Sequence, residues 1–236
     1  MPIHIRAGPG DVAENVIIAG DPGRIESLAG LLEDARLVNT NRGLIAYTGS
    51  LEGVRVTLAT HGMGGPSTAI VVEELHALGA RRIVRLGTSG SLRGEVAPGS
   101  IIVATHSLWI PGTCGLSLYY DRVPPTPVST PRLTLEIIEA LREDGIDPHV
   151  GPVFCSDSFY AEKGPVIDEA AKWGALAVEM ETATLYALSS LRGFESSALL
   201  VVSNSALDKS AYASPDTVGR LVRLGFQAII RAFSRL

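Results

Sequence analysis

The chain contains short runs of β-branched and aliphatic residues, most of them followed by a glycine-rich or polar turn. Continuous apolar runs of about four to eight residues are typical of strands buried on both faces of a sheet. We therefore predict strands at residues 15–20, 54–60, 81–88, 100–108, 149–156, 176–181 and 197–204.

Between these runs, apolar residues recur at the spacing of a helix with one buried face, which predicts helices at residues 66–79, 131–145, 181–193 and 214–233. Thr130-Pro131 and Ser214-Pro215 suit a capping hydroxyl followed by a proline in the first helical turn. Strands that alternate with helices favour an α/β fold around a central, largely parallel or mixed sheet. The proline-rich segment 109–131 is predicted to be a loop or a lid.

Composition narrows the class of protein. A chain of 236 residues with 46% hydrophobic content can bury one sizeable core, so we expect a single domain over residues 1–236. A net charge of -5 argues against a surface that binds along a nucleic-acid polymer.

The cysteines and the N-terminus limit the class of protein further. Cys114 and Cys155 lack CxxC spacing and could form at most one bridge. We expect no metal site, because histidines, cysteines and acids lack ligand spacing. With no signal-like N-terminus and no long apolar stretch, we expect a soluble cytoplasmic protein rather than a secreted or membrane protein.

Ligands of α/β sheets gather at the carboxyl ends of strands, so the residues after each apolar run are the candidates for chemistry. Residues 20–24, Gly-Asp-Pro-Gly-Arg, would let the backbone approach an anion beside an arginine, although an ordinary turn has the same composition. Arg85 lies inside an apolar run, two residues before the Gly-Thr-Ser-Gly turn 87–90. A buried charge is costly unless it is paired, so this segment predicts an oxyanion cradle or a salt bridge to a nearby carboxylate.

Glu179 and Glu181 flank a methionine where an apolar strand passes into a helix. If the strand persists, its period of two places both carboxylates on one side. A carboxylate there could accept both hydroxyls of a ribose, with Met180 packed against the sugar; a solvated strand end is the alternative. Ser203 and Asn204 also follow an apolar run and could read the edge of a heterocycle, or form a cap or turn.

The turn at residues 61–67, His-Gly-Met-Gly-Gly-Pro-Ser, is neither a triphosphate-binding loop nor a GxGxxG dinucleotide motif. Taken in order, GDPGR, NRG, THGMGGPS, RLGTSG, DSFY, VEMET and VVSN resemble the hexameric purine nucleoside phosphorylases and their relatives, the uridine and methylthioadenosine phosphorylases. The resemblance runs from His4 to the final helix, and its specificity lies in the combination. It implies a mixed, partly barrel-like central sheet flanked by helices. It also implies an enzyme that uses inorganic phosphate as co-substrate, without another cofactor, to cleave a nucleoside; the wider family also contains nucleosidases that use water.

The resemblance, together with the strand-end residues, assigns roles to individual positions. Phosphate is expected to contact Gly20, Arg24, Arg42, Arg85 and Thr88. Ribose is expected to contact His4, Met63, Met180 and Glu181. The base is expected to contact Phe159, Val178, Glu179, Ser203 and Asn204. Asn204, Arg24 and Arg85 are the expected catalytic residues. His4 and Arg42 are expected to cross a dimer interface within a homo-hexamer built as a trimer of dimers.

Asn204 stands where the best-known branch of this family has an aspartate, and Thr217 falls where that branch has an arginine that assists it. An amide is no general acid at ordinary pH, but it can accept from a protonated purine N7 and donate to an oxygen at C6. We therefore expect inosine and guanosine to be preferred over adenosine. Asp208 is an alternative source of the proton.

Four other functions remain open at this stage. Uridine phosphorylases normally carry Gln-x-Arg soon after the phenylalanine, whereas Phe159 is followed by Tyr-Ala-Glu-Lys-Gly-Pro. A methylthioadenosine phosphorylase fits the overall similarity, but Asn204 disfavours a 6-aminopurine. A hydrolytic nucleosidase would have little reason to keep Arg24, Arg42 and Arg85. The non-enzymatic alternative is a nucleoside-binding protein that has lost the family's acid.

Overall fold

The computed structural model describes residues 2–161, 164–208 and 210–236. The strands are β1 (Asn15–Ala19), β2 (Glu33–Asn39), β3 (Ala46–Leu51), β4 (Val54–Thr60), β5 (Arg82–Ser91), β6 (Ile101–Leu108), β7 (His149–Cys155), β8 (Ala177–Glu179) and β9 (Glu195–Ser205). The helices are α1 (Pro22–Ala29), α2 (Gly65–Ala77), α3 (Pro131–Glu143), α4 (Gly164–Lys172), α5 (Thr182–Arg192) and α6 (Pro215–Ser234). A short 3-10 turn spans Asn41–Gly43.

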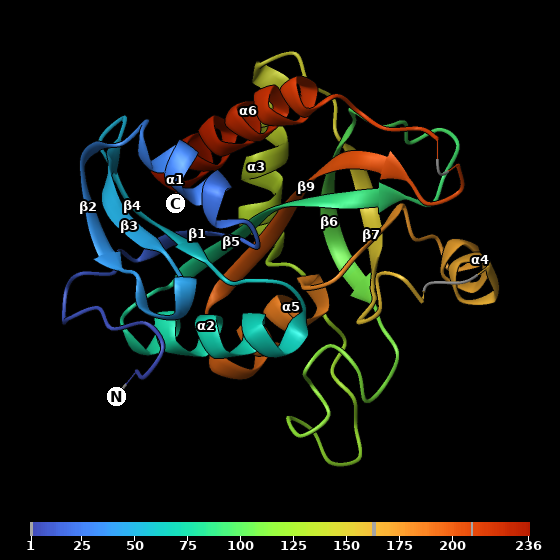
Figure 1. The fold of residues 1–236 in the computed structure, drawn as a ribbon, viewed down its shortest axis with the longest axis horizontal. Helices are drawn as coiled ribbons and strands as arrows, with labels where there is room; N and C mark the ends of the chain where they lie inside the picture. The colour runs from blue at the N-terminus through green and yellow to red at the C-terminus, as the bar shows by residue number, and fades with distance from the viewer. Residues whose placement is uncertain (1, 162–163, 209) are drawn as a thin grey trace.

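The strands form one mixed sheet in the order β2-β3-β4-β1-β5-β8-β7-β6-β9, and β5 also pairs with β9. This second pairing closes β5, β8, β7, β6 and β9 into a barrel, while β1 to β4 extend from β5 as an open wing (Figure 1). β5 runs parallel to β1 and β9, whereas β6 runs antiparallel to β9. The predicted α/β fold with a mixed, partly barrel-like sheet is confirmed.

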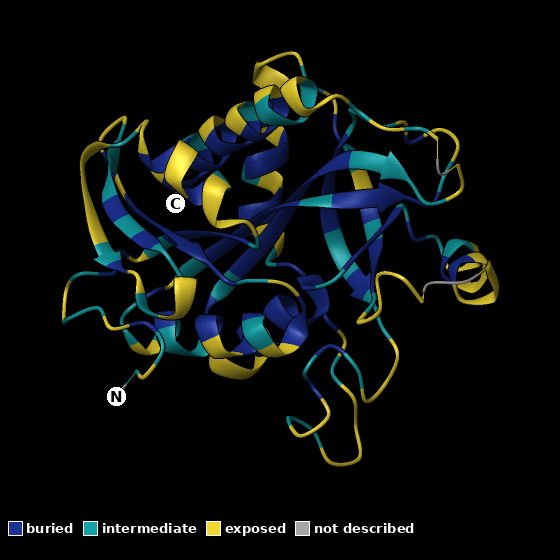
Figure 2. Ribbon diagram, viewed as in Figure 1, coloured by how far each residue is buried: buried dark blue, intermediate teal, exposed yellow. Residues whose placement is uncertain are grey.

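Helices cover the central strands on both sides, with α1, α3 and α6 on one face and α2 and α5 on the other (Figure 1). In β1, Ile17 packs into the core beneath the first group of helices, and Val16 and Ile18 pack beneath the second. Successive strand residues point to opposite faces, so burial of both faces requires an uninterrupted apolar run. The central strands are accordingly buried along most of their length (Figure 2).

The sequence pattern missed α1, α4, β2 and β3. β2 lies at the edge of the wing and is mostly exposed, so it needs no apolar run. α1 begins within the segment that resembled a turn: Asp21 accepts a hydrogen bond from the Gly23 N–H at 2.9 Å, and Pro22 occupies the first turn. The Asp-Pro-Gly sequence here therefore starts a helix.

The two predicted hydroxyl caps behave differently. Ser214 Oγ accepts from the Thr217 N–H at 3.1 Å and caps α6, as expected. Thr130 does not cap α3, because its Oγ1 accepts from the Ser196 N–H of β9 at 2.9 Å.

The segment between β6 and α3 is a loop, as predicted, with one isolated β-bridge from Val128 to His106. In the described part of the chain, no helix is both long and apolar enough to span a bilayer.

Candidate active site

A pocket of about 950 Å³ opens at the carboxyl ends of β1, β4, β5, β8 and β9. Of the residues predicted to bind phosphate, ribose or base, every one except His4 lines it. Residues from positions 20 to 212 of the chain therefore meet at one site. The described residues of the β6–α3 loop are not among those lining it, so this loop does not form the pocket's lid.

Arg85 is the buried centre of the site. Its Nε lies 3.2 Å from Glu179 Oε2, and its Nη2 donates to Glu181 Oε2. Gly87 leaves the space for the guanidinium, since a Cβ there would lie 1.9 Å from Arg85 Nη1. Burial alone would lower the pKa of Arg85, but the charges of Glu181 and Glu179 outweigh it and raise this pKa. The salt bridge to a carboxylate, which the sequence left open as the alternative to an oxyanion cradle, is thus present, here with two carboxylates.

Glu179 and Glu181 are both buried, which rules out a solvated strand end. β8 ends at Glu179, and Glu181 lies at the position just before α5. The strand therefore does not continue to Glu181, and its period of two does not place the two carboxylates on one side. The two carboxylates nevertheless converge, because both bind Arg85. Burial raises the pKa of Glu179, the charge of Glu181 adds to this rise, and Arg85 opposes it.

A second guanidinium approaches Arg85 at the end of the pocket nearest β1. Arg24 lies in the first turn of α1, and its Nη1 donates to the Leu86 carbonyl at 3.1 Å. Burial lowers the pKa of Arg24, and the positive charge of Arg85 lowers it further. Two partly desolvated arginines that repel each other are stabilised by an anion bound between them, and their forked N–H groups suit phosphate.

Hydroxyl groups line the same pocket as the guanidinium groups of Arg24 and Arg85. Thr88, which is predicted to contact phosphate, lines the pocket together with Arg85. Thr60 Oγ1 and Ser89 Oγ are buried and have no hydrogen-bond partner among the described residues, and both residues line the pocket. Buried polar groups are normally satisfied, so these hydroxyls are additional candidates for ligand contacts. Ser89 belongs to the predicted Gly-Thr-Ser-Gly turn, which the structure shows as part of strand β5, whereas Thr60 is marked in the sequence only by its place at a strand end.

The second carboxylate oxygen of Glu181, Oε1, binds the glycine-rich turn before α2. Glu181 Oε1 accepts from the Gly64 N–H at 2.7 Å. Met180 is half-buried, whereas Met63 is 83% exposed at the pocket's edge. Both methionines line the same pocket as Glu181.

The wall formed by β8, β9 and the segment after β7 carries the predicted base contacts. Ser203 Oγ lies 3.0 Å from Asn204 Oδ1 and donates to it, which leaves Asn204 Nδ2 as a donor. Gly90 makes room for this amide, because a Cβ there would lie 3.2 Å from Nδ2. Val178 is buried, and Phe159 is 62% exposed.

Glu179 also lines the pocket, but its carboxylate is already engaged. Besides Arg85, it accepts from the N–H groups of Glu181 and Thr182, each at 2.9 Å. These bonds favour a role in holding Arg85 and the start of α5 over a direct contact with the base. Tyr160 and Tyr212 line the pocket without having been predicted. Tyr212 follows no apolar run and reaches the site only through its β-bridge with Asn204.

His4 lies away from the pocket of its own chain. Its Nδ1 is 2.8 Å from Glu74 Oε1, and the same carboxylate accepts from the backbone N–H groups of Ile3, His4 and Ile5. Arg42 is exposed and lines the pocket of its own chain. Asp208 binds Ser210 and is not among the described residues that line the pocket.

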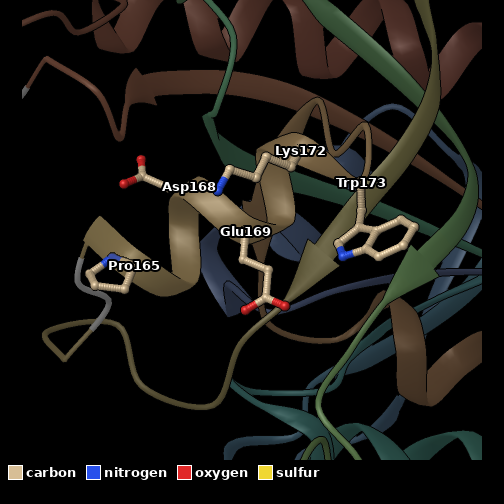
Figure 3. Close-up of a pocket in the computed structure, with 5 residues that line it drawn as sticks. All are labelled: Pro165, Asp168, Glu169, Lys172 and Trp173. Atoms are coloured by element: carbon tan, nitrogen blue, oxygen red, sulfur yellow. The ribbon is translucent and has the colours of Figure 1, made fainter.

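A separate hollow of about 580 Å³ lies on the surface of α4 and the residue that follows it (Figure 3). Its walls are Pro165, Asp168, Glu169, Lys172 and Trp173. Two acids and a single lysine line it, so this hollow lacks the cationic character of the pocket around Arg85. The chemistry predicted from the sequence belongs to the larger pocket.

Comparisons with known proteins identify the family of the chain. The sequence profile of the Phosphorylase superfamily matches residues 14–235. A guanosine phosphorylase of Halorubrum lacusprofundi is 33% identical, over 96% of this chain and 97% of its own length. A DeoD-type purine nucleoside phosphorylase of Caldanaerobacter subterraneus is 35% identical, over 92% and 93% respectively.

Uridine phosphorylases are similar as well. That of Thermococcus kodakarensis is 34% identical, over 86% of this chain and 76% of its own length. The crystal structure of the Vibrio fischeri uridine phosphorylase in complex with 6-hydroxy-1-naphthoic acid superposes with a TM-score of 0.86 at 25% identity, over 95% of this chain and 93% of that one. A matching fold, a matching profile over nearly the whole chain and relatives above 30% identity lead to one conclusion: the chain belongs to the phosphorylase superfamily and is a pentosyltransferase of the nucleoside phosphorylase family.

Proposed function

We propose that this enzyme cleaves purine nucleosides and deoxynucleosides with phosphate and prefers 6-oxopurines such as inosine and guanosine. The observation that carries the proposal is the orientation of Asn204. Because Ser203 donates to its Oδ1, Nδ2 is left as a donor in the base wall. A donor matches the C6 oxygen of hypoxanthine or guanine and opposes the C6 amino group of adenine. The guanosine phosphorylase among the relatives supports the same preference.

The proposed reaction needs positioning and electrostatics more than acid catalysis. Arg24 and Arg85 orient the phosphate that attacks the anomeric carbon, with Gly20, Thr88 and Arg42 as further contacts. Glu181 anchors the ribose hydroxyls while the sugar develops positive charge, and Met63, Met180 and His4 complete the ribose site. Phe159 and Val178 enclose the purine, and Ser203 and Asn204 hydrogen-bond its edge. Glu179 acts mainly through Arg85.

Uridine phosphorolysis is the second candidate, because two of the similar proteins are uridine phosphorylases. Asn204 is compatible with a pyrimidine carbonyl, since its amide can donate to any carbonyl oxygen. The absence of Gln-x-Arg after Phe159 in the sequence counts against it.

We infer that the active unit is at least a dimer and propose a trimer of dimers. His4 does not line its own pocket, so a role at the sugar requires a neighbouring copy. Arg42 lies exposed at the rim and can be shared in the same way. We further propose a single domain over residues 1–236 and a cytoplasmic role in purine salvage.

Phosphorolysis of inosine, guanosine, adenosine, methylthioadenosine and uridine, each with and without phosphate, tests the proposal. We expect phosphate-dependent release of hypoxanthine and guanine at the highest kcat/KM. Adenosine or uridine turning over as fast as inosine would contradict the 6-oxopurine preference. Cleavage without phosphate would identify a hydrolase, and binding without cleavage would identify a nucleoside-binding protein.

Asn204→Asp provides the matching variant, since a carboxyl group can protonate and donate to the leaving purine. We expect the adenosine-to-inosine ratio of kcat/KM to rise at least about tenfold, which corresponds to about 1.4 kcal/mol of transition-state discrimination. Asn15→Asp is the control, because Asn15 lies at the opposite end of β1 and its Oδ1 accepts from Arg82. An unchanged ratio in Asn204→Asp would show that Asn204 does not select the base.

A further inference from the structure

The two cysteines of the chain lie side by side although 41 positions separate them. Cys114 belongs to the loop between β6 and α3, and Cys155 is the last residue of β7. Both are buried free thiols, and their Sγ atoms are 2.9 Å apart. Neither thiol takes part in the proposed phosphorolysis.

Several contacts fix the backbone of Cys114 next to β7. Its N–H donates to Asp157 Oδ2 at 2.9 Å, and its carbonyl accepts from Thr184 Oγ1 at 2.6 Å. Gly65, at the start of α2, packs so closely that a Cβ there would lie 2.2 Å from the Cys114 carbonyl carbon. Cys114 also has a φ of 55°, a left-handed conformation that non-glycine residues adopt only where the surroundings hold it. Contacts from three separate segments therefore hold the loop where its thiol meets Cys155.

We propose that Cys114 and Cys155 are an oxidation site that forms an intramolecular disulfide and covalently ties the β6–α3 loop to β7. A low-molecular-weight disulfide such as oxidised glutathione is the oxidant. One cysteine thiolate attacks it and releases one glutathione, and the second thiolate then attacks the mixed disulfide and releases another. The two protein thiols lose two protons and two electrons in total, and the small disulfide gains them as two thiols. Closure brings the sulfurs from 2.9 Å to about 2.05 Å, a side-chain movement.

The surroundings also set how this site reacts. Burial, followed by the hydrogen bond with Cys114, holds the pKa of Cys155 well above its usual range. The thiolate is the reacting species, so the closed structure oxidises slowly at neutral pH and faster when the loop opens or the pH rises. Ser156, next to Cys155, donates its N–H to the Glu179 carbonyl at 2.8 Å. The bridge would therefore anchor the end of β7 beside the carboxylate that holds Arg85.

The test follows the thiols of the intact enzyme. The reduced protein is incubated with oxidised glutathione at pH 8, quenched, denatured, and analysed by thiol counting, intact mass and non-reducing peptide mapping. We expect both thiols to disappear together, a loss of about two mass units without a glutathione adduct, and one peptide that links Cys114 to Cys155. The melting temperature should rise by roughly 10 °C, because the bridge closes a loop of about 40 residues in the unfolded chain.

Cys114→Ser and Cys155→Ser are the matched variants, and each should lose the oxidant-dependent rise in melting temperature. The thiol count and mass of the wild-type protein decide the question even if a variant folds poorly. Two thiols that persist after incubation at pH 8 would overturn the proposal. So would glutathione adducts on both cysteines, or a disulfide between two chains.

Discussion

Arg85 shows how a single buried residue can carry both stability and chemistry. Its side chain binds Glu179 and Glu181, and all three groups are almost completely buried. Removing one partner of such a cluster leaves uncompensated charge in the interior, which costs about 3–5 kcal/mol. An exposed ion pair contributes only about 0–1 kcal/mol, because water already solvates both charges.

We predict that Arg85→Met lowers the free energy of unfolding by about 3–5 kcal/mol at pH 7, measured by urea denaturation. It should also abolish phosphorolysis. Arg142→Met is the control, because Arg142 pairs with Asp147 at 3.0 Å on the surface of α3, with side chains 58% and 82% exposed. Equal losses in the two variants would show that the two carboxylates find other compensation.

At the scale of elements, glycines in β5 let two functional side chains lie against the strand. Gly87 accommodates the guanidinium of Arg85, and Gly90 accommodates the amide of Asn204. Both positions belong to the Gly-Thr-Ser-Gly sequence in the last part of β5. The sequence suggested a donor-rich turn there, whereas the structure shows extended strand whose glycines are needed for space.

We predict that Gly87→Ala displaces Arg85 and lowers kcat/KM on the order of 100-fold, since misplacing a reacting group by about 1 Å has that effect. The measurement is steady-state phosphorolysis of inosine. Gly219→Ala serves as the control, because Gly219 lies in α6 with open space around its Cα. It should keep full activity and gain about 0.5–1 kcal/mol of stability from the better helix former. Full activity in Gly87→Ala would mean that Arg85 tolerates displacement.

At the scale of the whole molecule, the pocket joins the barrel to the open wing. β5 belongs to both parts, since it pairs with β1 on one side and with β8 and β9 on the other. His61, just after β4, is fully buried at this junction, where its Nδ1 lies 3.1 Å from Thr68 Oγ1. Burial, followed by the positive charge of Arg85, holds the pKa of His61 well below its usual range.

This depressed pKa has a defined effect on stability. The unfolded chain protonates His61 near pH 6.5, whereas the folded protein keeps it neutral to lower pH. The unfolded state therefore binds more protons below pH 6.5, and stability falls as the pH falls through that value toward the folded pKa. The slope from this residue is at most about 1.4 kcal/mol per pH unit.

We predict that the free energy of unfolding of the wild type falls more steeply between pH 6.5 and pH 5.5 than that of His61→Asn. Urea denaturation at several pH values measures both. Because other groups titrate equally in the two proteins, the difference between the curves isolates His61. Parallel curves would show that His61 keeps an ordinary pKa in the folded state.

Local patterns in the chain predicted the central strands, the four longest helices and strand-end residues of the pocket such as Arg85 and Asn204. The family resemblance was needed for Arg42 and Phe159, and Tyr212 was not predicted. Strands buried on both faces must be continuously apolar, and sheet ligands bind at strand ends. Both features can therefore be recognised from short segments of the sequence. The edge strand β2 and the short helix α1 have a weaker hydrophobic pattern in the sequence, because much of their surface is exposed to water.

Which of these residues contact one another was decided by tertiary structure. Arg85 lies 94 positions from Glu179, and no local pattern indicates that these two side chains meet, nor that Cys114 meets Cys155. Thr130 likewise had the sequence of a helix cap, but its hydroxyl binds Ser196 of a distant strand. Hydrophobic periodicity specifies which face of an element is buried, whereas the partner of a buried polar group depends on how the elements pack across the sheet.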